Sequence, residues 1–298
     1  MEGWMNRCTL CPRRCGADRT VSVGRCGVGE QVRLARAALH FWEEPCVSGA
    51  EGSGTVFFSG CSLGCVFCQN YQISAGHFGR DIPVERLAEI FLELQEQKAN
   101  NINLVTGGHY IPQIVRALDL VRGKLHIPVV YNSSGYETVE ALRMLKGYVD
   151  VYLPDLKYRS PERGARYSHA PDYFAVASKA ILEMLDQVGP VQFDGRGMIQ
   201  RGLIVRHMVM PNGVEDSMDI LTWIAGNLPL DDILVSVMSQ YTPFYKSGEY
   251  PEIDRRLTAQ EYDRVLDWLD CMGIENGFVQ ELSSAKEEYT PDFSLQGV

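Results

Sequence analysis

The chain has 298 residues, 45% of them hydrophobic and 22% charged, which is enough for one barrel-sized α/β domain with a small appendage. The formal net charge of -10 argues against non-specific binding of nucleic acid, and no apolar run reaches the about 20 residues that a membrane span needs. The nine cysteines are odd in number, lie at spacings typical of metal ligands and follow no secretion signal, so we expect a reducing, cytoplasmic location.

The first cysteines form a group near the N-terminus. Cys8, Cys11, Cys15 and Cys26 have the spacing C-x2-C-x3-C-x10-C, and glycines among them allow tight backbone turns. Because this segment is too short for a core of its own, we expect a metal centre to hold it together. A zinc ion and a second [4Fe-4S] cluster both take about four thiolates, so the sequence leaves both open, as it does a purely stabilising role. For Cys46, a small buried residue is favoured over a fifth ligand.

A second cysteine group follows an apolar strand predicted at residues 55–59. Cys61, Cys65 and Cys68 have the spacing C-x3-C-x2-C, and Phe67 precedes the last of them. Three thiolates on a short loop suit a [4Fe-4S] cube and leave one of its irons open to a substrate or cofactor. The alternatives are a zinc site and three unrelated buried thiols. Structural zinc prefers four protein ligands, commonly in C-x2-C or C-x4-C pairs, so the spacing favours the cluster.

The rest of the chain alternates predicted strands and helices. Short apolar runs rich in Val and Ile predict strands at residues 55–59, 101–106, 127–132, 149–155, 203–210 and 233–238, with a weaker one at 277–280. The apolar spacing i, i+3, i+4, i+7 predicts helices that include residues 87–94 and 262–269, the second opened by a capping box of Thr258 and Glu261. About six βα units in series indicate a parallel sheet that can close into a full or partial barrel.

We expect three units along the chain. Residues 1–50 would form the cysteine-rich appendage, residues 51–282 the core, and residues 283–298 a polar tail that runs as a loop over the surface. Residues 40–44 precede the core and are candidates for a lid over the barrel mouth, although packing of their aromatic side chains onto the barrel is favoured. Residues 238–241 end a predicted strand and are candidates to face the cavity.

The ends of the predicted strands carry the candidate site, because active sites of parallel α/β barrels lie at the C-terminal ends of the strands. These ends carry polar or glycine residues: Gly107, Gly108, Asn132, Ser134, Asp155, Lys157 and His207. Each group also has an ordinary structural explanation. The glycines suit any βα turn, Asp155 and Lys157 could form a surface salt bridge worth at most ~1 kcal/mol, and His207 could be a hydrogen-bonded core histidine.

The C-x3-C-x2-C motif, with an aromatic residue before its third cysteine, resembles the signature of the radical S-adenosylmethionine (SAM) superfamily. The resemblance implies a partial (β/α)6 barrel of the TIM type, in which Cys61, Cys65 and Cys68 hold a [4Fe-4S] cluster that binds SAM. It implies reductive cleavage of SAM to methionine and a 5′-deoxyadenosyl radical that abstracts hydrogen from a substrate. It also implies an electron donor such as flavodoxin or ferredoxin.

Within the superfamily, the chain resembles activating enzymes of glycyl radical proteins, such as the pyruvate formate-lyase activase. The segments FWEEPCVSG, GSGTVFFSGC, CVFCQN, NINLVTGGHY, VVYNSSGYE and YLPDLKY are similar to a less characterised branch of activase-like iron–sulfur proteins, over nearly the whole chain. The resemblance implies that the SAM pocket contains Gly107, Gly108, Asn132, Ser134, Asp155, Lys157 and His207. Asp155 would anchor the methionyl end, and Lys157 and His207 would reach the carboxylate or ribose. His109 and Asn132 stand where these families carry glutamate and aspartate.

Three functions are consistent with these patterns. The first is an activase that removes hydrogen from a glycine of a partner protein. The second is direct radical modification of a small molecule or peptide, and the third is a non-catalytic redox or metal-binding protein. We expect no nucleic-acid partner and no membrane attachment. Release of 5′-deoxyadenosine after reduction in the presence of SAM would distinguish both enzymes from the carrier.

Overall fold

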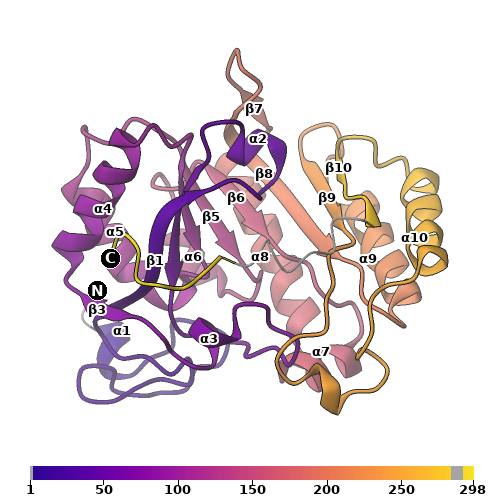
Figure 1. The fold of residues 1–298 in the computed structure, drawn as a ribbon, viewed down its shortest axis with the longest axis horizontal. Coiled ribbons are helices and arrows are strands. Elements are labelled where there is room, and N and C mark those ends of the chain that lie inside the picture. Colours follow the sequence, from indigo (N-terminus) through magenta and orange to yellow (C-terminus); the bar gives the residue numbers. More distant parts are fainter. Residues whose placement is uncertain (1–2, 283–290) are drawn as a thin grey trace.

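The computed structural model describes residues 3–282 and 291–298, and one sheet runs through them (Figure 1). Its strands are β1 (Val32–His40), β2 (Ser53–Phe58), β3 (Arg80–Ile82), β4 (Ile102–Val105), β5 (Val129–Ser133), β6 (Val151–Pro154), β7 (Gln192–Phe193), β8 (Ile199–Met208), β9 (Leu234–Met238) and β10 (Gly277–Val279). Their order in space is β10-β9-β8-β6-β5-β4-β2-β1-β3, with β7 paired to β8 alone.

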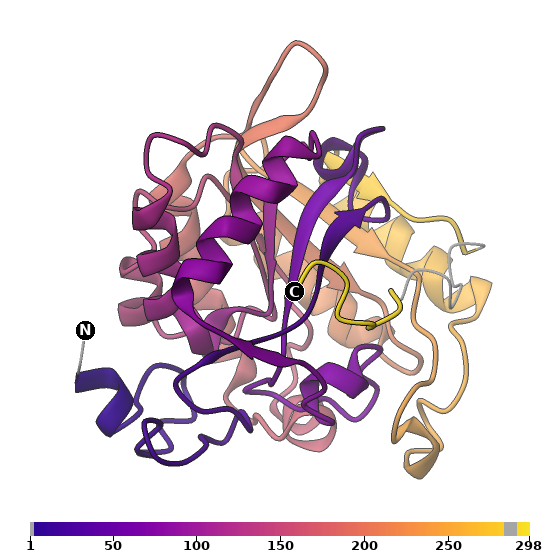
Figure 2. The same ribbon diagram turned by 60° about the vertical axis from the view of Figure 1, so that its left-hand side comes forward.

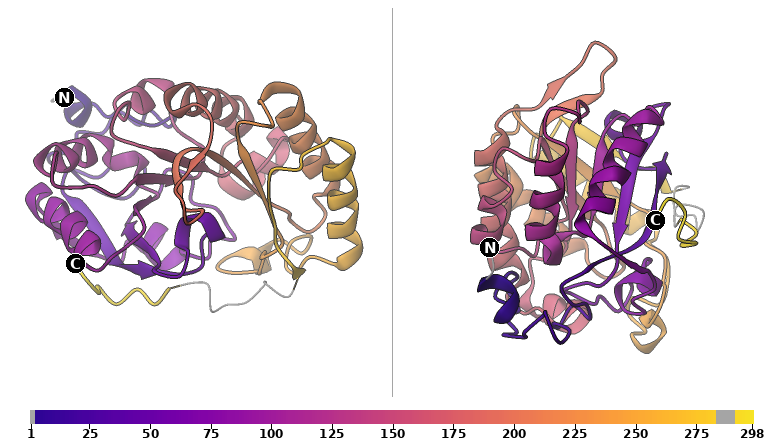
Figure 3. Two further views of the ribbon diagram at one scale, coloured as in Figure 1. Left: turned by 90° about the horizontal axis from the view of Figure 1, so that it is seen from above. Right: turned by 90° about the vertical axis from the view of Figure 1, so that its left-hand side faces the viewer.

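The helices form a second layer outside the curved sheet (Figures 1 and 3). They are α1 (Gly3–Asn6), α2 (Pro45–Ser48), α3 (Tyr71–Ser74), α4 (Val84–Glu96), α5 (Ile111–Leu120), α6 (Val139–Arg143), α7 (Pro161–Ser168), α8 (Tyr173–Val188), α9 (Val214–Asn227) and α10 (Ala259–Cys271), with 3-10 turns at Gly108–Tyr110 and Ser247–Glu249. The short α1, α2, α3 and α7 lie at the ends of the sheet. In the described part of the chain, no helix combines the length and apolarity that a membrane crossing requires.

The central strands are parallel. Each neighbouring pair along β2, β4, β5, β6, β8, β9 and β10 is parallel, and the connections between successive strands contain α4, α5, α6, α8, α9 and α10. Every residue of β2, β4, β5, β6 and β9 is buried, as expected for strands covered on both faces. The predicted α/β fold with a mostly parallel sheet is confirmed, and the predicted strands and capping box are present with boundaries shifted by a few residues.

One strand of the sheet was not predicted. Residues Val32–His40 form β1, which runs antiparallel to β2 and to β3, with Leu34 opposite Phe58 and His40 opposite Ser53. The sequence VRLARAALH carries arginines and alanines where a buried strand usually carries Val and Ile. The apolar pattern that predicts a strand is therefore not evident in it. The sheet therefore begins inside the range that we expected to form the appendage, and the irregular cysteine-rich part precedes Val32.

The described end of the C-terminal tail packs along β1 (Figure 2). Ala37 donates its backbone N–H to the Gln296 carbonyl at 2.8 Å, and Leu295 donates to the Ala35 carbonyl at 3.1 Å. Phe293 is buried, and its ring meets that of Phe57 edge-on at a centroid distance of 5.5 Å. Residues 291–298 thus lie along β1 and are anchored there by an aromatic side chain, while the first part of the expected tail lies outside the described residues.

Truncation of this anchor should destabilise the protein. We expect Phe293→Ala to lower the free energy of unfolding by about 3 kcal/mol, because it removes a buried ring that packs against Phe57. Urea denaturation of the anaerobically purified protein measures the change. The neighbouring exposed Ser294→Ala should change stability by less than about 0.5 kcal/mol, and equal effects of the two variants would contradict the assigned anchoring.

Candidate functional site

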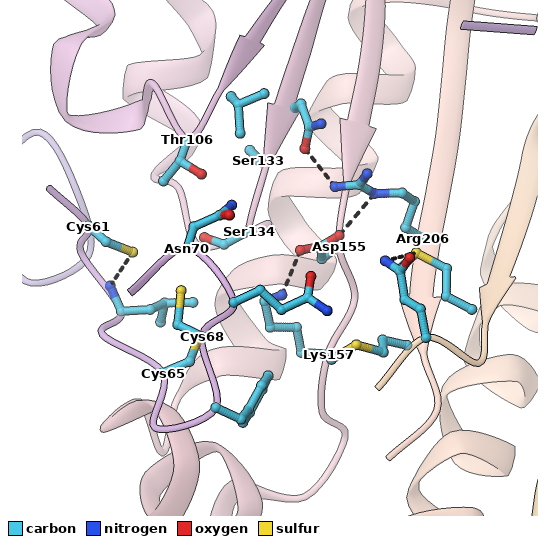
Figure 4. Close-up of a pocket in the computed structure, with 18 of the residues that line it drawn as sticks. Cys61, Cys65, Cys68, Asn70, Thr106, Ser133, Ser134, Asp155, Lys157 and Arg206 are labelled. Atoms are coloured by element: carbon cyan, nitrogen blue, oxygen red, sulfur yellow. Dashed lines mark hydrogen bonds and ion pairs between the residues drawn. The ribbon is translucent and has the colours of Figure 1, made fainter. Parts of the chain in front are cut away.

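A cavity lies at the C-terminal end of the parallel strands (Figure 4). One wall is the loop after β2, which carries three cysteines. The facing wall consists of residues at the ends of four strands and just beyond them, including Thr106, Asn132, Ser133, Ser134, Asp155, Lys157, Arg206 and Met208. The parallel topology brings these residues, which are distant in sequence, to the same end of the sheet.

Cys61, Cys65 and Cys68 all line this cavity, and all nine cysteines of the chain are free thiols. The Ser168 hydroxyl donates a hydrogen bond to Cys65 Sγ at 2.9 Å. Ser74 Oγ lies 3.2 Å from Cys68 Sγ, and the backbone N–H of Leu63 points at Cys61 Sγ at 3.4 Å. Burial raises the pKa of Cys65, and it raises that of Cys68 to about 12. The three sulfurs thus converge on one cavity with donors beside them, an arrangement suited to metal-bound thiolates.

A charged network closes the opposite wall (Figure 4). Asp155 accepts from Lys157 Nζ at 2.6 Å and from Arg206 Nε at 3.0 Å. The same guanidinium donates to Glu43 Oε2 at 3.1 Å and to Asn132 Oδ1 at 2.6 Å. The side chains of Asp155 and Lys157 are each only 16% exposed, so they do not form the surface salt bridge considered from the sequence.

The network keeps Asp155, Lys157 and Arg206 charged. Burial alone would raise the pKa of Asp155, but the positive charges of Lys157 and Arg206 outweigh it and lower that pKa. Burial alone would lower the pKa of Lys157, but Asp155 outweighs it and the pKa is raised. The pKa of Arg206 is raised because the nearby carboxylates outweigh its burial. All these groups are therefore ionised near neutral pH, and the wall offers fixed charges of both signs to a polar ligand.

Comparison with known proteins identifies the family. A family model for the radical SAM superfamily matches residues 55–221, which include the three cysteines and the strand ends described above. The chain belongs to the radical SAM superfamily. It is also 36% identical over 277 residues to the uncharacterized protein MJ0674 of Methanocaldococcus jannaschii, a match that covers 90% of this chain and 75% of that protein.

A solved structure shows a similar fold. The crystal structure of Streptococcus suis SuiB bound to S-adenosylmethionine has a TM-score of 0.50 and 13% sequence identity to this chain. The match covers 76% of this chain and 50% of SuiB, so the chain spans about half the length of that protein. At this identity the likeness concerns the fold alone, and it agrees with the parallel sheet and outer helices.

Membership of the radical SAM superfamily implies a [4Fe-4S] cluster and SAM. The donor set fits the cluster, because Cys61, Cys65 and Cys68 are free thiols that line one cavity. Across residues 3–282 and 291–298, no three His, Cys, Asp or Glu side chains are placed as ligands of a single metal ion. A cluster makes a different demand, since each thiolate binds its own iron.

Three of the residues expected in the SAM pocket are not among the described residues that line the cavity. The carbonyl of Gly107 accepts the backbone N–H of Tyr110, and a Cβ on Gly107 would lie 2.7 Å from Ile114 Cδ1. A Cβ on Gly108 would lie 3.0 Å from Glu137 Oε1. These glycines therefore allow close packing behind the strand end.

His207 is the third of these residues, and it lies in the core. Its Nδ1 is 2.7 Å from the Leu156 carbonyl oxygen and its Nε2 is 2.9 Å from Ser217 Oγ, so both ring nitrogens have protein partners. Burial lowers its pKa. These contacts fit the alternative of a hydrogen-bonded core histidine. Through the Leu156 carbonyl, His207 supports the turn from Asp155 to Lys157 on the side away from the cavity.

Arg206 was not predicted as a site residue, although the alternation of side chains along β8 is a signal for it. Successive residues of a strand point to opposite faces, and in β8 Arg206 and Met208 line the cavity while His207 points into the core. Thr106 was also missed. It lies at the end of β4 with φ 59°, which is uncommon for a β-branched residue and places strained backbone beside the cavity.

Residues 40–44, which were candidates for a lid over the barrel mouth, lie at the opposite end of the barrel. Because β1 is antiparallel to β2, its last residue, His40, pairs with Ser53 at the start of β2. The segment therefore covers the N-terminal ends of the parallel strands and forms the floor of the cavity instead of a lid over its mouth. From there, Glu43 reaches Arg206 and accepts from Asn103 and Asn132, each at 3.1 Å. Cys46, just beyond it, is buried in an apolar cluster, as favoured from the sequence.

Glu137 gives this site a pH-dependent contribution to stability. It is buried behind Gly108 and accepts from the Ser133 hydroxyl at 3.1 Å, and burial raises its pKa from 4.5 to about 7. A carboxyl whose pKa is higher in the folded than in the unfolded state stabilises the folded protein at pH values below its unfolded-state pKa. This stabilisation is lost as the pH rises through the folded-state pKa. Between pH 4.5 and pH 8 this group should therefore cost up to about 3 kcal/mol of stability.

Glu137→Gln tests this expectation. The variant should lose the contribution of this carboxyl, so its free energy of unfolding should fall less than that of the wild type between about pH 5 and pH 8. Urea denaturation at the two pH values measures both slopes. Glu140→Gln, an exposed carboxylate on the same connection, serves as the control. A wild-type slope retained in Glu137→Gln would show that Glu137 is ionised in the folded protein.

Proposed function

We propose that this radical SAM protein is an enzyme that abstracts a hydrogen atom from a glycine of a partner polypeptide, in the manner of glycyl-radical activating enzymes. One observation carries the first half of the proposal: the three cysteines and the charged strand ends line the same cavity. The sequence resemblance to activases, including the Asp155-Leu156-Lys157 turn that lines this cavity, supports the second half.

Each wall of the cavity has a proposed role. Cys61, Cys65 and Cys68 hold the [4Fe-4S] cluster, and the residues that face them bind SAM: Asn132, Ser134, Asp155, Lys157 and, in addition to the sequence prediction, Arg206. When bound, the reduced cluster and SAM supply reductive cleavage of the sulfonium and hydrogen-atom abstraction. Opposite charges in a shielded wall can pair with the amino and carboxylate groups of an amino acid.

The remaining residues of the site orient these groups and exclude water. Arg206 holds Asp155 in place, and His207 fixes the Leu156 carbonyl between Asp155 and Lys157. We therefore propose His207 as a positioning residue. Apolar side chains on the cavity wall, among them Phe57 and Phe67, limit the access of solvent to the reacting atoms. The enzyme requires a reductant, and we propose flavodoxin or ferredoxin as the electron donor. We also propose a location in the reducing cytoplasm, because none of the nine cysteines forms a disulfide.

SAM binding should depend on Lys157. We expect Lys157→Met to weaken SAM binding at least about 10-fold, because it removes a charge from the wall, while Asp155 keeps Arg206 as a partner. Equilibrium binding of SAM to the anaerobically reconstituted protein measures the change. Lys146→Met, whose ammonium lies at an exposed pair with Asp186, should bind SAM as the wild type does. Equal affinities of the two variants would remove Lys157 from the proposed pocket.

The source of the hydrogen can be identified by isotope transfer. A uniformly deuterated cell extract is divided by ultrafiltration, and each fraction is incubated with the protein, SAM and a chemical reductant. We expect deuterium in the 5′-deoxyadenosine formed with the macromolecular fraction, and a glycyl radical signal by electron paramagnetic resonance in that fraction. Deuterium from the filtrate alone would favour modification of a small molecule.

The cysteine variants supply the control for this experiment. Cys68→Ala should form no 5′-deoxyadenosine, because it removes one of three cluster ligands, whereas Cys271→Ala removes an exposed thiol of α10 and should react as the wild type does. A wild-type protein with a full cluster that yields no 5′-deoxyadenosine from SAM would support the non-catalytic alternative instead.

A further inference from the structure

The four N-terminal cysteines are brought together beside the cluster loop. A Cβ placed on Gly24 would lie 3.3 Å from Cys26 Sγ and 3.6 Å from Cys15 Sγ, so these two thiols border the same point. Cys8 and Cys15 are close enough to interact electrostatically, as is Cys11 with the other three thiols. The spacing in sequence alone did not establish this convergence.

The segment that carries them has little else to hold its shape. Residues 7–31, all of them described, form turns and bends without a helix or strand between α1 and β1. Its buried apolar side chains are few, with Leu10 and Val28 the main examples. An irregular segment of this size with four convergent thiols is typical of a metal-stapled unit, in which binding of the metal supplies the folding free energy.

This segment contacts the cluster loop directly. The carbonyl of Cys26 accepts the backbone N–H of Cys61 at 3.2 Å, so ligands of the two cysteine groups are joined by one hydrogen bond. The close approach depends on Gly60, whose φ is 88° and whose Cβ would lie 2.7 Å from the Cys26 carbonyl oxygen.

Arg13 makes a second connection. Its Nε donates to the Ser62 carbonyl at 2.8 Å, and its Nη2 donates to the Ser168 carbonyl at 2.9 Å. Nη1 donates to the carbonyl of His169. Ser168 in turn donates its hydroxyl to Cys65 Sγ. Arg13 stands between Cys11 and Cys15 in the sequence, and its guanidinium links the cluster loop to the end of α7 that supports Cys65.

Arg19 makes a third connection from the same segment. Its side chain is buried, and Nη1 donates to the His109 carbonyl at 2.6 Å while Nη2 donates to the Gly29 carbonyl at 2.6 Å. The ring of His109 lies 2.8 Å from the Ser59 carbonyl, just before the cluster loop. Both arginines thus join the four-cysteine segment to backbone that flanks the radical SAM site.

We propose that Cys8, Cys11, Cys15 and Cys26 bind a second metal centre through four thiolates, and that this centre positions the cluster loop at residues 61–68 through Arg13. The present positions suit a [4Fe-4S] cluster, in which each thiolate binds its own iron, whereas zinc would require the four sulfurs to move toward a single ion. The centre supports the loop and does not contact substrate. The first half of the proposal is independent of the proposed function, and the second half rests on the cluster assigned to Cys61, Cys65 and Cys68.

Metal analysis tests the first half. The full-length triple variant Cys61→Ala, Cys65→Ala, Cys68→Ala, reconstituted anaerobically with iron, sulfide and zinc, should retain about one zinc or about four irons per chain. Adding Cys11→Ser and Cys26→Ser should remove that metal, whereas adding Cys271→Ser should leave it bound. A folded triple variant without zinc or iron, or full metal in the five-cysteine variant, would overturn the proposal. Because the triple variant lacks the proposed radical site, either result is independent of catalysis.

Arg13→Met tests the second half and leaves all four ligands in place. We expect the N-terminal metal to be retained and the cluster at Cys61, Cys65 and Cys68 to be lost to a chelator about 10-fold faster than in the wild type, followed by its visible absorbance. Arg14→Met is the control, because the guanidinium of Arg14 makes no hydrogen bond or ion pair within the described residues.

Two outcomes would contradict the coupling. One is loss of the cluster from Arg13→Met at the wild-type rate, and the other is equal acceleration in Arg13→Met and Arg14→Met. Circular dichroism and a urea titration of each variant show whether the whole chain is destabilised. Accelerated cluster loss without a matching fall in global stability assigns the effect to the loop.

Discussion

The site depends on one guanidinium, that of Arg206, which is only partly exposed. Arg206 of β8 forms hydrogen bonds with side chains from the end of β6, from β5 and from the segment that closes the barrel floor: Asp155, Asn132 and Glu43. Removing these charges from water is costly, and the cost is offset only when each charge has partners at hydrogen-bonding distance. The network therefore constrains where β5, β6 and β8 end relative to one another, and the proposed SAM wall is a consequence of that constraint.

The opposite wall is fixed by packing and backbone contacts more than by charge. The loop with Cys61, Cys65 and Cys68 has few elements of its own, and its surroundings come from distant parts of the chain. The N-terminal segment approaches it through Cys26 and Arg13, and α7 approaches it through Ser168. A loop that must present three sulfurs to one cluster needs such external support, because short loops do not fix side-chain positions alone.

Segments near both ends of the described chain pack against the barrel. The N-terminal segment lies against the loop at the C-terminal end of the strands, and residues 291–298 lie along β1 with Phe293 buried. Pro291 reaches the cavity itself, so the tail contributes to the site as well as to stability. The radical SAM fold is thus supplemented on two sides by segments that have little regular structure and contact the barrel through backbone hydrogen bonds.

Local patterns in the sequence were enough to predict the α/β fold, the βα order and the three-cysteine motif, because parallel strands buried on both faces and clustered thiols leave strong signals. The sequence also placed Asn132, Ser134, Asp155 and Lys157 at strand ends that do meet in one cavity. Only the tertiary structure showed that Arg206, not His207, faces that cavity, that β1 belongs to the sheet, and that Glu43 reaches the site from the barrel floor. These features depend on strand register and on contacts between residues far apart in the chain, which local patterns do not encode.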